Sequence, residues 1–339
     1  MSCRICLLPG DGIGPEVIAQ AEKVLKSLDL QIEFEYGNIG FAAYKKHGTP
    51  LPESTLDAIL RCDAALFGAV TTPPDVPGYF SPVVRMRQTL DLYANVRPCR
   101  SVDHPASRPG IDLVIVRENT EDLYSGVERV EDNGNRAIGE MIITRRASER
   151  ISRKAFELAR AEGRQKVTIV HKANILRQTC GLFRRTALEV ANEFPEIEAK
   201  EMLVDTCAME LVRAPEQFDV IVTTNLFGDI LSDEASMLVG GLGVACSGNL
   251  GPKAAVFEPV HGSAPDLVGK HTANPIATFL SAALLLDHIQ EAANAARLRQ
   301  AVLDCVAQQA LTPDLGGTFS TEQVTDRVIS TLENIPERK

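Results

Sequence analysis

The chain has 339 residues, which corresponds to about two domains. Hydrophobic residues make up 45% and charged residues 24% of the chain, a composition that fits a globular protein and argues against disordered or fibrous classes. The net charge of -10 and the low aromatic content of 5%, with no Trp, disfavour polyanion partners and a base-stacking nucleic-acid surface.

The N-terminal segment predicts no cleaved export signal, because Gly and Asp interrupt the first apolar run. The longest apolar stretch, 276–286, is too short to span a bilayer. Both features predict a cytoplasmic protein. Of the eight scattered cysteines, only Cys3 and Cys6 have the spacing of metal ligands, and no second such pair exists. We therefore predict buried free thiols rather than a metal or redox site.

Apolar runs of strand length alternate with amphipathic segments, which predicts an α/β protein. Strands are predicted at 4–8, 32–36, 64–70, 91–97, 111–117, 166–171 and 219–223, with an exposed strand or arm at 136–144. Helices are predicted at 15–28, 52–62, 83–90, 148–161, 181–194, 226–239, 275–290, 291–308 and 321–335. Pro, Ser and Gly collect at 98–109 and 239–251, which are candidate domain boundaries.

Two of the apolar strands end in arginine, at Arg97 and Arg117, and Arg87 lies on the helix before the first of them. Ligands of open α/β sheets bind beyond the carboxyl ends of the strands, so we expect these guanidinium groups to face a crevice. Such groups suit a substrate with more than one carboxylate or phosphate. Their position alone fits equally well with arginines that pair with acidic neighbours.

Asp229 and Asp233 lie four residues apart on a predicted helix and therefore share one helical face. Like charges at this spacing destabilise a helix unless a cation lies between them, and carboxylates suit Mg²⁺ or Mn²⁺. Two solvated aspartates on a surface helix are the simpler interpretation of the spacing alone. Asp205 also follows a predicted apolar strand and could supply a third ligand.

Tyr124 and Lys172 each follow a predicted strand. A lysine at the dry end of a strand can act as a base, and a nearby tyrosine as an acid. The alternative for both residues is a side chain that extends its polar head into water.

Two glycine-containing loops could bind phosphate groups. Gly10, Gly12 and Gly14 precede a helix, but their spacing departs from both GxGxxG and GxxxxGK[ST], so a simple tight turn is the alternative. In the second loop, Gly262 to Asp266, backbone amides could approach an anion while Asp266 accepts hydrogen bonds from ribose. An acidic group there favours a cofactor without a 2'-phosphate, although an ordinary Gly/Pro loop is again the alternative.

Several long segments, in fixed order, resemble the metal-dependent β-decarboxylating dehydrogenases, the isocitrate and isopropylmalate dehydrogenase family. These segments are LLPGDGIGPEV, LDLYANVRP, VIVRENTEDLYSG, VHKANI, NLFGDILSDEAS, FEPVHGSAPDLVGK, ANPIAT and TPDLGG. The resemblance implies a two-domain α/β fold of the isopropylmalate dehydrogenase type with a shared central sheet, not a Rossmann dinucleotide fold. It implies a large domain of 1–98 and 240–339 on the cofactor side, and a small domain of 99–239 with the dimer interface, an arm and the metal ligands.

In this family the segment before the helical arginine sets the substrate, and here it reads YFSPVVRMR. The chain keeps Ser81 but has Val83 where isocitrate enzymes typically have Asn, and Asn119 where isopropylmalate enzymes usually have Leu. The pattern is most similar to homoisocitrate dehydrogenases of lysine biosynthesis, which implies NAD-dependent oxidative decarboxylation of homoisocitrate to 2-oxoadipate. Isocitrate, 3-isopropylmalate and D-malate are the alternative substrates. A non-catalytic regulatory subunit and a metal-dependent hydrolase are the alternatives from other classes.

The resemblance also implies a role for each matching residue. Tyr124, Lys172 and Asp205 would be catalytic, and Mg²⁺ or Mn²⁺ would be bound by Asp205, Asp229 and Asp233. The substrate would be bound by Thr72, Ser81, Arg85, Arg87, Arg97, Arg117, Tyr124, Lys172 and Asn174. NAD would be bound by Val70, Thr71, Asn174, His261, Gly262, Ser263, Ala264, Pro265, Asp266, Asn274 and Asp314. Lys172 and Asp205 would come from a second subunit, so a homodimer is the expected assembly, with neither nucleic acid nor membrane as a partner.

Overall fold

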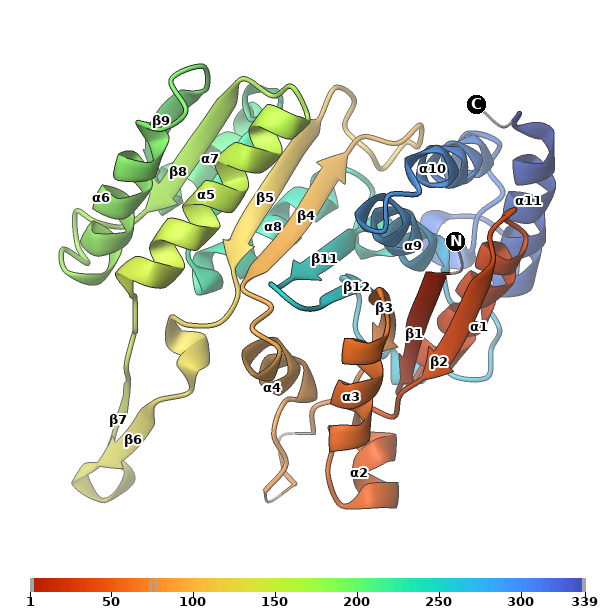
Figure 1. Ribbon diagram of the computed structural model, residues 1–339, viewed down its shortest axis with the longest axis horizontal. Coiled ribbons are helices and arrows are strands. Elements are labelled where there is room, and N and C mark those ends of the chain that lie inside the picture. The colour runs from red at the N-terminus through yellow and green to blue at the C-terminus, as the bar shows by residue number, and fades with distance from the viewer. Residues whose placement is uncertain (1–2, 74, 77, 337–339) are drawn as a thin grey trace. The chain divides into compact units, whose positions relative to one another are not determined.

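The computed structural model describes residues 3–73, 75–76 and 78–336, and it is of the α/β type (Figure 1). The chain forms two compact units. The first consists of Met1–Leu90, Ser101–Pro109 and Val239–Lys339, and the second of Asp91–Arg100 and Gly110–Leu238. This division differs from the expected domains at three places, because 91–98 belongs to the second unit and 101–109 and Val239 belong to the first.

The first unit contains five strands in the order β2-β1-β3-β12-β11. These are β1 (Cys3–Gly10), β2 (Ile32–Tyr36), β3 (Ala64–Ala69), β11 (Cys246–Leu250) and β12 (Ala255–Pro259). All neighbours are parallel except β11 and β12. The helices are α1 (Gly14–Lys26), α2 (Phe41–His47), α3 (Glu53–Arg61), α4 (Pro82–Thr89), α9 (Ile276–His288), α10 (Ala292–Ala307) and α11 (Thr321–Asn334).

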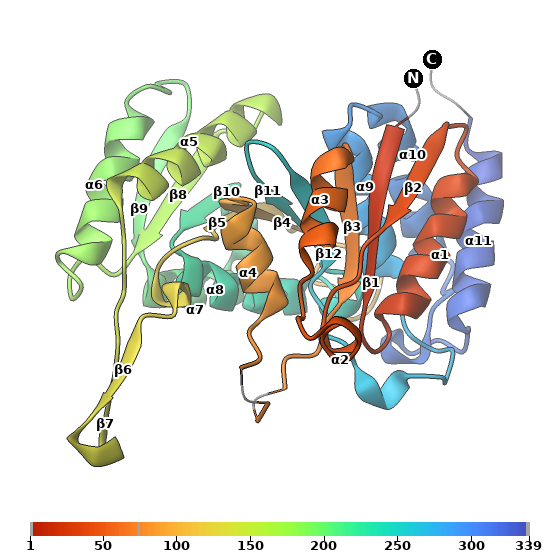
Figure 2. The same ribbon diagram turned by 60° about the horizontal axis from the view of Figure 1, so that its bottom comes forward.

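The main core of the first unit lies on one face of this sheet. Alternate residues of β1, such as Ile5 and Leu7, pack there with the apolar faces of α1, α9, α10 and α11. Because side chains alternate along a strand, the intervening residues Cys6 and Leu8 point to the opposite face. The helix α3 lies on that second side (Figure 2).

The second unit contains five strands in the order β4-β5-β10-β8-β9, of which only β4 and β5 are antiparallel. These are β4 (Ala94–Arg100), β5 (Asp112–Glu118), β8 (Lys166–His171), β9 (Glu198–Leu203) and β10 (Val220–Thr223). The helices α5 (Arg145–Ala161) and α6 (Thr179–Ala191) cover one face, and α7 (Val204–Arg213) and α8 (Asn225–Leu238) cover the other (Figures 1 and 2).

Two smaller features of the second unit matter below. A one-turn 3-10 helix, η1 (Leu123–Ser125), follows β5 and carries Tyr124. The hairpin of β6 (Glu128–Glu131) and β7 (Arg136–Gly139) then extends away from the body of the unit as an arm (Figures 1 and 2). The arm predicted at 136–144 is thus the returning strand of a hairpin.

Most predicted helices and strands are confirmed to within a few residues, and 32–36 and 166–171 match β2 and β8 completely. The elements α2, α7, β6, β11 and β12 were not predicted, and the strand expected before Asp205, which is β9, was predicted without bounds. The strand β9 reads EAKEML and is largely exposed, whereas β11 reads CSGNL, with two residues that strands disfavour. In both segments pairing with a neighbouring strand overrides a weak local preference.

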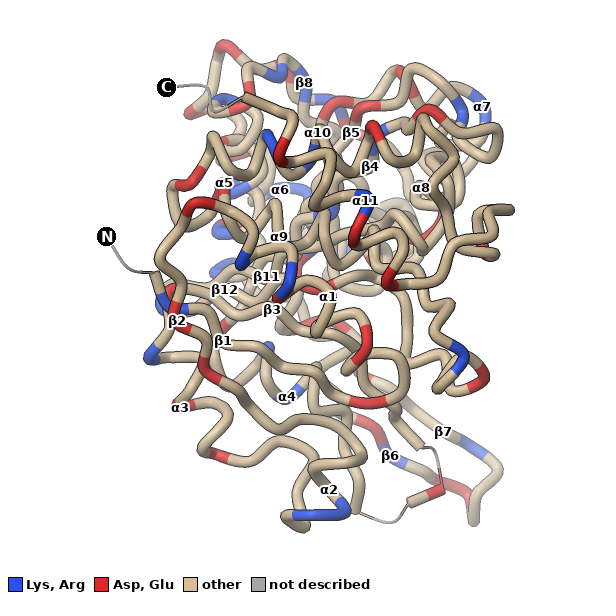
Figure 3. Tube along the Cα trace, turned by 90° about the vertical axis from the view of Figure 1, so that its right-hand side faces the viewer, with Lys and Arg blue, Asp and Glu red and all other residues tan. Residues whose placement is uncertain are grey.

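The surface features of the described chain agree with the composition. All eight cysteines are free and six are buried, which confirms the prediction of buried free thiols for those six, whereas Cys3 and Cys62 are partly exposed. Basic and acidic segments are interspersed along the trace (Figure 3). Within residues 3–73, 75–76 and 78–336, no helix combines the length and the apolar character needed to cross a membrane.

Candidate active site

The side chains of Arg97 and Arg117 both reach the side of the sheet that α8 covers, but not because both residues lie at strand ends, as the sequence had suggested. Arg117 lies near the end of β5, whereas Arg97 lies in the middle of β4, and the two strands are antiparallel. The expectation that both arginines extend from strand ends at one edge of the sheet is therefore wrong. Arg117 lies opposite Asn95, and Asn95 and Arg97 share a face of β4, so both arginines reach the side covered by α8.

On that side the two guanidinium groups converge on the carboxylates of α8. Arg97 Nη1 donates to Asp233 Oδ1 over 3.1 Å, and Arg97 Nη2 lies 3.5 Å from Asp229 Oδ1. Arg117 Nη1 donates to the same Asp229 oxygen. Arg97 and Arg117 are only 7% and 1% exposed, so each cation depends on these carboxylates for compensation. The arginines thus pair with acidic neighbours, and these neighbours are two of the three predicted metal ligands, Asp229 and Asp233.

Tyr124 belongs to the same cluster. Its hydroxyl donates a hydrogen bond to Asp229 Oδ2, and the Arg117 guanidinium lies 5.0 Å from the centre of its ring. Burial, followed by the hydrogen bond to Asp229, raises the pKa of the Tyr124 phenol above its ordinary value. Burial also raises the pKa of the Asp233 carboxyl, and the Arg97 guanidinium offsets part of that increase. The phenol therefore keeps its proton near neutral pH, as a general acid must.

Three polar side chains that the sequence analysis missed hold the arginines. Asn225 Oδ1 accepts from Nε and Nη2 of Arg117, at 3.0 and 2.7 Å. Asn95 Oδ1 accepts from Arg97 Nε at 2.7 Å, and Ser232 Oγ accepts from Arg97 Nη1 at 2.6 Å. Asn225 precedes Asp229 by four residues, so the helical spacing that identified the two aspartates could also have identified Asn225.

Gly228 provides the space that Arg117 needs. A Cβ atom at this position would lie 2.6 Å from Arg117 Cγ and 2.7 Å from Arg117 Cβ. No side chain fits at this point of α8 unless the arginine moves. The glycine therefore lets the helix approach β5 closely enough for Asp229 to reach the guanidinium group.

Lys172 and Asp205 form a separate pair in the second unit. Lys172 follows β8, Asp205 lies in the first turn of α7, and Lys172 Nζ donates to Asp205 Oδ1. This hydrogen bond lowers the pKa of Asp205. In the part of the chain that the structure describes, no three acidic, histidine or cysteine side chains lie close enough to hold a metal ion, so Asp205 does not join Asp229 and Asp233 within one chain. Asn174 lies exposed in the turn after Lys172.

Arg87 lies in the first unit and is 7% exposed. Its Nη2 donates to Glu258 Oε1 over 2.8 Å, and Asn249 Nδ2 donates to the same oxygen over 2.8 Å. Arg87 Nε is buried and has no hydrogen-bond partner in the described structure. Buried donors normally have partners, so this orphaned group is suited to an incoming anion.

The remaining substrate candidates lie around the beginning of α4 in the first unit. Ser81 is the N-cap of α4, and its hydroxyl accepts from the Val84 amide over 3.4 Å. Arg85 is exposed and its guanidinium lies 4.7 Å from the centre of the Phe80 ring. Thr72 lies exposed in the loop that follows β3. The structure thus gives Ser81 a local structural role and leaves Arg85 and Thr72 accessible.

The first glycine loop is a tight turn rather than a phosphate cradle. The amide of Asp11 donates to Ala69 O at 2.7 Å and that of Ile13 to Ser263 O at 2.9 Å, so both donors are already used. A Cβ at Gly12 would lie 1.9 Å from Ser263 O. Gly12 therefore allows close packing of the turn against Ser263, and Gly10 and Gly14 allow close packing against Ala69, which agrees with the tight-turn alternative.

The second loop brings several cofactor candidates together. Thr71 Oγ1 donates to Ser263 Oγ over 2.8 Å, and the Thr71 amide donates to Asp11 Oδ2 over 2.9 Å. Val70 immediately precedes Thr71 at the end of β3. Asp11, which the sequence analysis did not select, also accepts the amides of Phe41 and Ala42 and so anchors α2.

The other cofactor candidates lie in the same unit. Asn274 Nδ2 donates to Asp314 Oδ2 over 2.9 Å. His261 Nδ1 lies 3.0 Å from Gly262 O, and its buried Nε2 has no partner in the described structure. Burial lowers the pKa of His261, which favours the neutral ring. Ala264 has a φ of 38°, Pro265 begins a 3-10 turn (Pro265–Leu267), and Asp266 is exposed.

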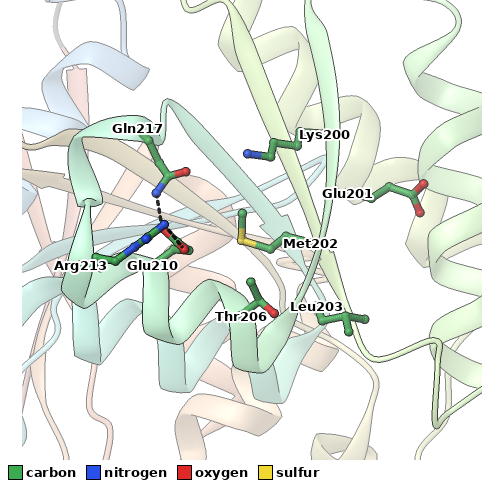
Figure 4. Close-up of a pocket in the computed structure, with 8 residues that line it drawn as sticks. All are labelled: Lys200, Glu201, Met202, Leu203, Thr206, Glu210, Arg213 and Gln217. Carbon is green, nitrogen blue, oxygen red and sulfur yellow. Dashed lines mark hydrogen bonds and ion pairs between the residues drawn. The ribbon is translucent and has the colours of Figure 1, made fainter.

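A cavity of about 380 Å³ lies between β9 and α7, apart from the predicted site residues (Figure 4). Among its lining residues, Glu210 accepts hydrogen bonds from Arg213 and Gln217. The lining residues are Lys200, Glu201, Met202, Leu203, Thr206, Glu210, Arg213 and Gln217. Leu203 and Thr206 flank Asp205 in sequence, but Asp205 itself does not line the cavity.

The fold is of the α/β type, and its second unit holds a cluster of buried arginine, aspartate and tyrosine side chains. The sequence profile of the isocitrate/isopropylmalate dehydrogenase family matches residues 4–328, and the chain belongs to this family of decarboxylating dehydrogenases. The predicted family and fold class are thereby confirmed.

Individual relatives carry different substrate names. The isocitrate/homoisocitrate dehydrogenase of Thermus thermophilus is 52% identical over 99% of this chain and 100% of its own length. The 3-isopropylmalate dehydrogenase of Methanothermobacter thermautotrophicus is 48% identical over 98% of this chain and 99% of its own. The crystal structure of isocitrate dehydrogenase from Methylococcus capsulatus superposes with a TM-score of 0.94 at 44% identity, covering 97% and 99% of the two chains.

Proposed function

We propose that the protein catalyses the NAD-dependent oxidative decarboxylation of homoisocitrate to 2-oxoadipate, with Mg²⁺ or Mn²⁺ as the metal. The observation that carries this proposal is the cluster of the second unit, in which Arg97, Arg117, Tyr124 and Asp229 are held together by hydrogen bonds and ion pairs. Buried cations suit a substrate with several carboxylates, and a protonated phenol beside them suits proton delivery to carbon.

The residues present fit both a divalent ion and a dinucleotide. Asp229 and Asp233 expose 33% and 58% of their side chains, so their hard oxygen atoms are accessible to a cation. The partnerless His261 Nε2 can accept a hydrogen bond from a cofactor, and a Cβ at Gly262 would meet no atom within 4 Å. When bound, the ion would polarise the substrate oxygen and NAD⁺ would accept the hydride.

The chain's own residues then have distinct tasks. The guanidinium groups of Arg87, Arg97 and Arg117 bind the carboxylate that is lost as CO₂. Lys172, paired with Asp205, receives the proton of the substrate hydroxyl. The Tyr124 hydroxyl later donates its proton to the carbon from which CO₂ has departed. Asn174 lies next to the substrate on the nicotinamide side.

A second copy of this chain completes the site in our proposal. Met209 and Val212 on α7, and Ile230 and Met237 on α8, are each more than half exposed although they are apolar. Apolar faces of this kind are typical of association surfaces. The separation of Asp205 from Asp229 and Asp233 within one chain also supports a partner that supplies Lys172 and Asp205.

The choice of homoisocitrate is supported by the segment around Ser81 and by the name of the Thermus relative. The test is a comparison of kcat/KM for homoisocitrate, isocitrate, 3-isopropylmalate and D-malate, each with NAD⁺ and NADP⁺ and with Mg²⁺ or Mn²⁺. The highest value for homoisocitrate with NAD⁺ is expected. A higher value for another acid would replace the substrate, and the absence of all turnover by the single purified chain would favour a regulatory subunit.

A further inference from the structure

Asp122, which the proposed reaction does not use, has an unusual backbone conformation. It lies between β5 and η1, and it is fully buried. Its φ of 72° and ψ of -150° fall in a region that is essentially restricted to glycine. A residue with a side chain persists there only when its surroundings compensate for the strain. The contacts of the side chain show what that compensation is.

Both oxygens of the Asp122 carboxylate accept backbone amides. Oδ1 accepts from the Leu123 amide at 2.8 Å, at the beginning of η1, and Oδ2 accepts from the Leu226 amide at 3.0 Å, in the first turn of α8. The first amides of a helix have no partner within the helix, so one side chain caps two helices. Asn225 Nδ2 adds a bond to the backbone oxygen of Glu121, at 3.1 Å.

These bonds form a closed ring with the proposed acid. Tyr124 is the central residue of η1, and its hydroxyl donates to Asp229 one turn further along α8 from Asn225. The turn is thus attached to α8 at two points, by the Asp122 carboxylate and by the Tyr124 phenol. Because α8 is a continuous helix, the attachment at Asp122 determines where the phenol meets Asp229.

We propose that Asp122 is a positioning residue, which holds η1 against the beginning of α8 and thereby sets the position of the Tyr124 hydroxyl. The inference rests on the proposed function, because it takes Tyr124 as the proton donor to carbon. Asp122 is fully buried and acts through Tyr124. A short carboxylate is required, because asparagine offers only one of the two acceptors and glycine offers none.

Two variants separate the effect of the hydrogen bonds of the Asp122 carboxylate, the tether, from the effect of its backbone conformation. Glycine adopts this conformation without strain, so Asp122→Gly removes both side-chain bonds and retains the fold. Its kcat for oxidative decarboxylation should fall about tenfold, since small misplacements of a catalytic group have effects of this order, while the KM for the acid and for NAD⁺ changes less than about twofold. Asp122→Asn, which retains one acceptor, should recover about half of that loss on a logarithmic scale.

The double variant with Tyr124→Phe shows whether Asp122 acts through the phenol. In that background Asp122→Gly should change kcat less than about twofold, because no hydroxyl remains to be positioned. An equal loss in both backgrounds would show a general structural effect and would overturn the proposal. The proposal would also be overturned if Asp122→Gly alone, with Tyr124 present, left kcat undiminished.

Amide hydrogen exchange tests the tether without turnover. Peptides that contain Leu123 and Leu226 should exchange about tenfold faster in Asp122→Gly than in the wild type, whereas peptides from β8 and α5 should not change. Unchanged amide exchange at Leu123 and Leu226 would overturn the proposal that Asp122 attaches η1 to α8, whether or not the protein is active. If the wild type turns over none of the acids, the proposed function fails, and the exchange result still decides whether the tether exists.

Discussion

Among the candidate site residues, Arg97 and Arg117 of the second unit pair with carboxylates of α8, whereas Arg87 and His261 of the first unit each have one buried nitrogen without a hydrogen-bond partner in the described structure. Arg117 makes contacts to Asn225 and Asp229. In contrast, Arg87 Nε and His261 Nε2 are orphaned in the described structure. The comparison indicates two kinds of binding site. The two arginines of the second unit are held by carboxylates of the same chain, whereas the two nitrogens of the first unit are polar groups that a ligand would satisfy.

The largest expected effect concerns the organised cluster of the second unit. Tyr124→Phe should lower kcat for oxidative decarboxylation about 10³-fold, because the proton donor is lost, while reduction of the oxo-intermediate is largely retained. Steady-state assays of the two partial reactions measure this difference. Equal losses in both would remove the acid role of Tyr124 and leave the cluster without a catalytic group.

The packing of the same cluster gives the next prediction. Gly228→Ala should destabilise the protein by about 1–3 kcal/mol, because its Cβ would overlap the Arg117 side chain. Gly262→Ala in the first unit is the matched control, since a Cβ there meets nothing within 4 Å, and it should cost less than about 0.5 kcal/mol. Chemical denaturation of both variants provides the measurement. Similar stabilities of the two variants would mean that the folded protein does not depend on the close approach of α8 to Arg117.

The next prediction concerns the proposed cofactor site of the first unit. Asp266→Lys should weaken the use of NAD⁺ about tenfold, because a ribose acceptor is lost, and should improve the use of NADP⁺ through the new positive charge. The KM for the acid substrate should stay unchanged. If the affinity for NAD⁺ is unaltered, Asp266 is not part of the cofactor site.

The smallest expected effect is a pH dependence at the base of the arm. Glu121 accepts the amide and hydroxyl hydrogens of Thr144, the N-cap of α5, and burial raises its pKa from 4.5 to about 7. Between about pH 4.5 and 7 the Glu121 carboxyl therefore keeps its proton in the folded protein, whereas the unfolded chain releases it. The contribution of this protonated carboxyl to the free energy of unfolding is fully present below about pH 4.5 and is lost as the pH rises through about 7.

Glu121→Gln removes this titration. Between about pH 4.5 and 7 the wild type should lose about 1 kcal/mol of stability relative to Glu121→Gln, less than the full shift implies because the carboxyl is partly exposed. Denaturation curves of both proteins across this pH range measure the difference. Parallel pH profiles would show that Glu121 titrates normally in the folded state.

The sequence by itself determined the family, the fold class and most helices and strands, because long motifs and apolar periodicity are local properties of the chain. It also selected Asp229 and Asp233, since helical spacing alone places them on one face. Only the tertiary structure decided that Arg97 lies within an antiparallel strand, that Asn225 and Ser232 hold the arginines, and that Asp122 joins η1 to α8. These facts depend on strand direction and on the packing of α8 against β4 and β5. The packing of α8 brings together residues more than 100 positions apart, a distance over which no local pattern carries information. The pairing of β4 with β5 joins residues 12 to 24 positions apart, and no local pattern gives its direction.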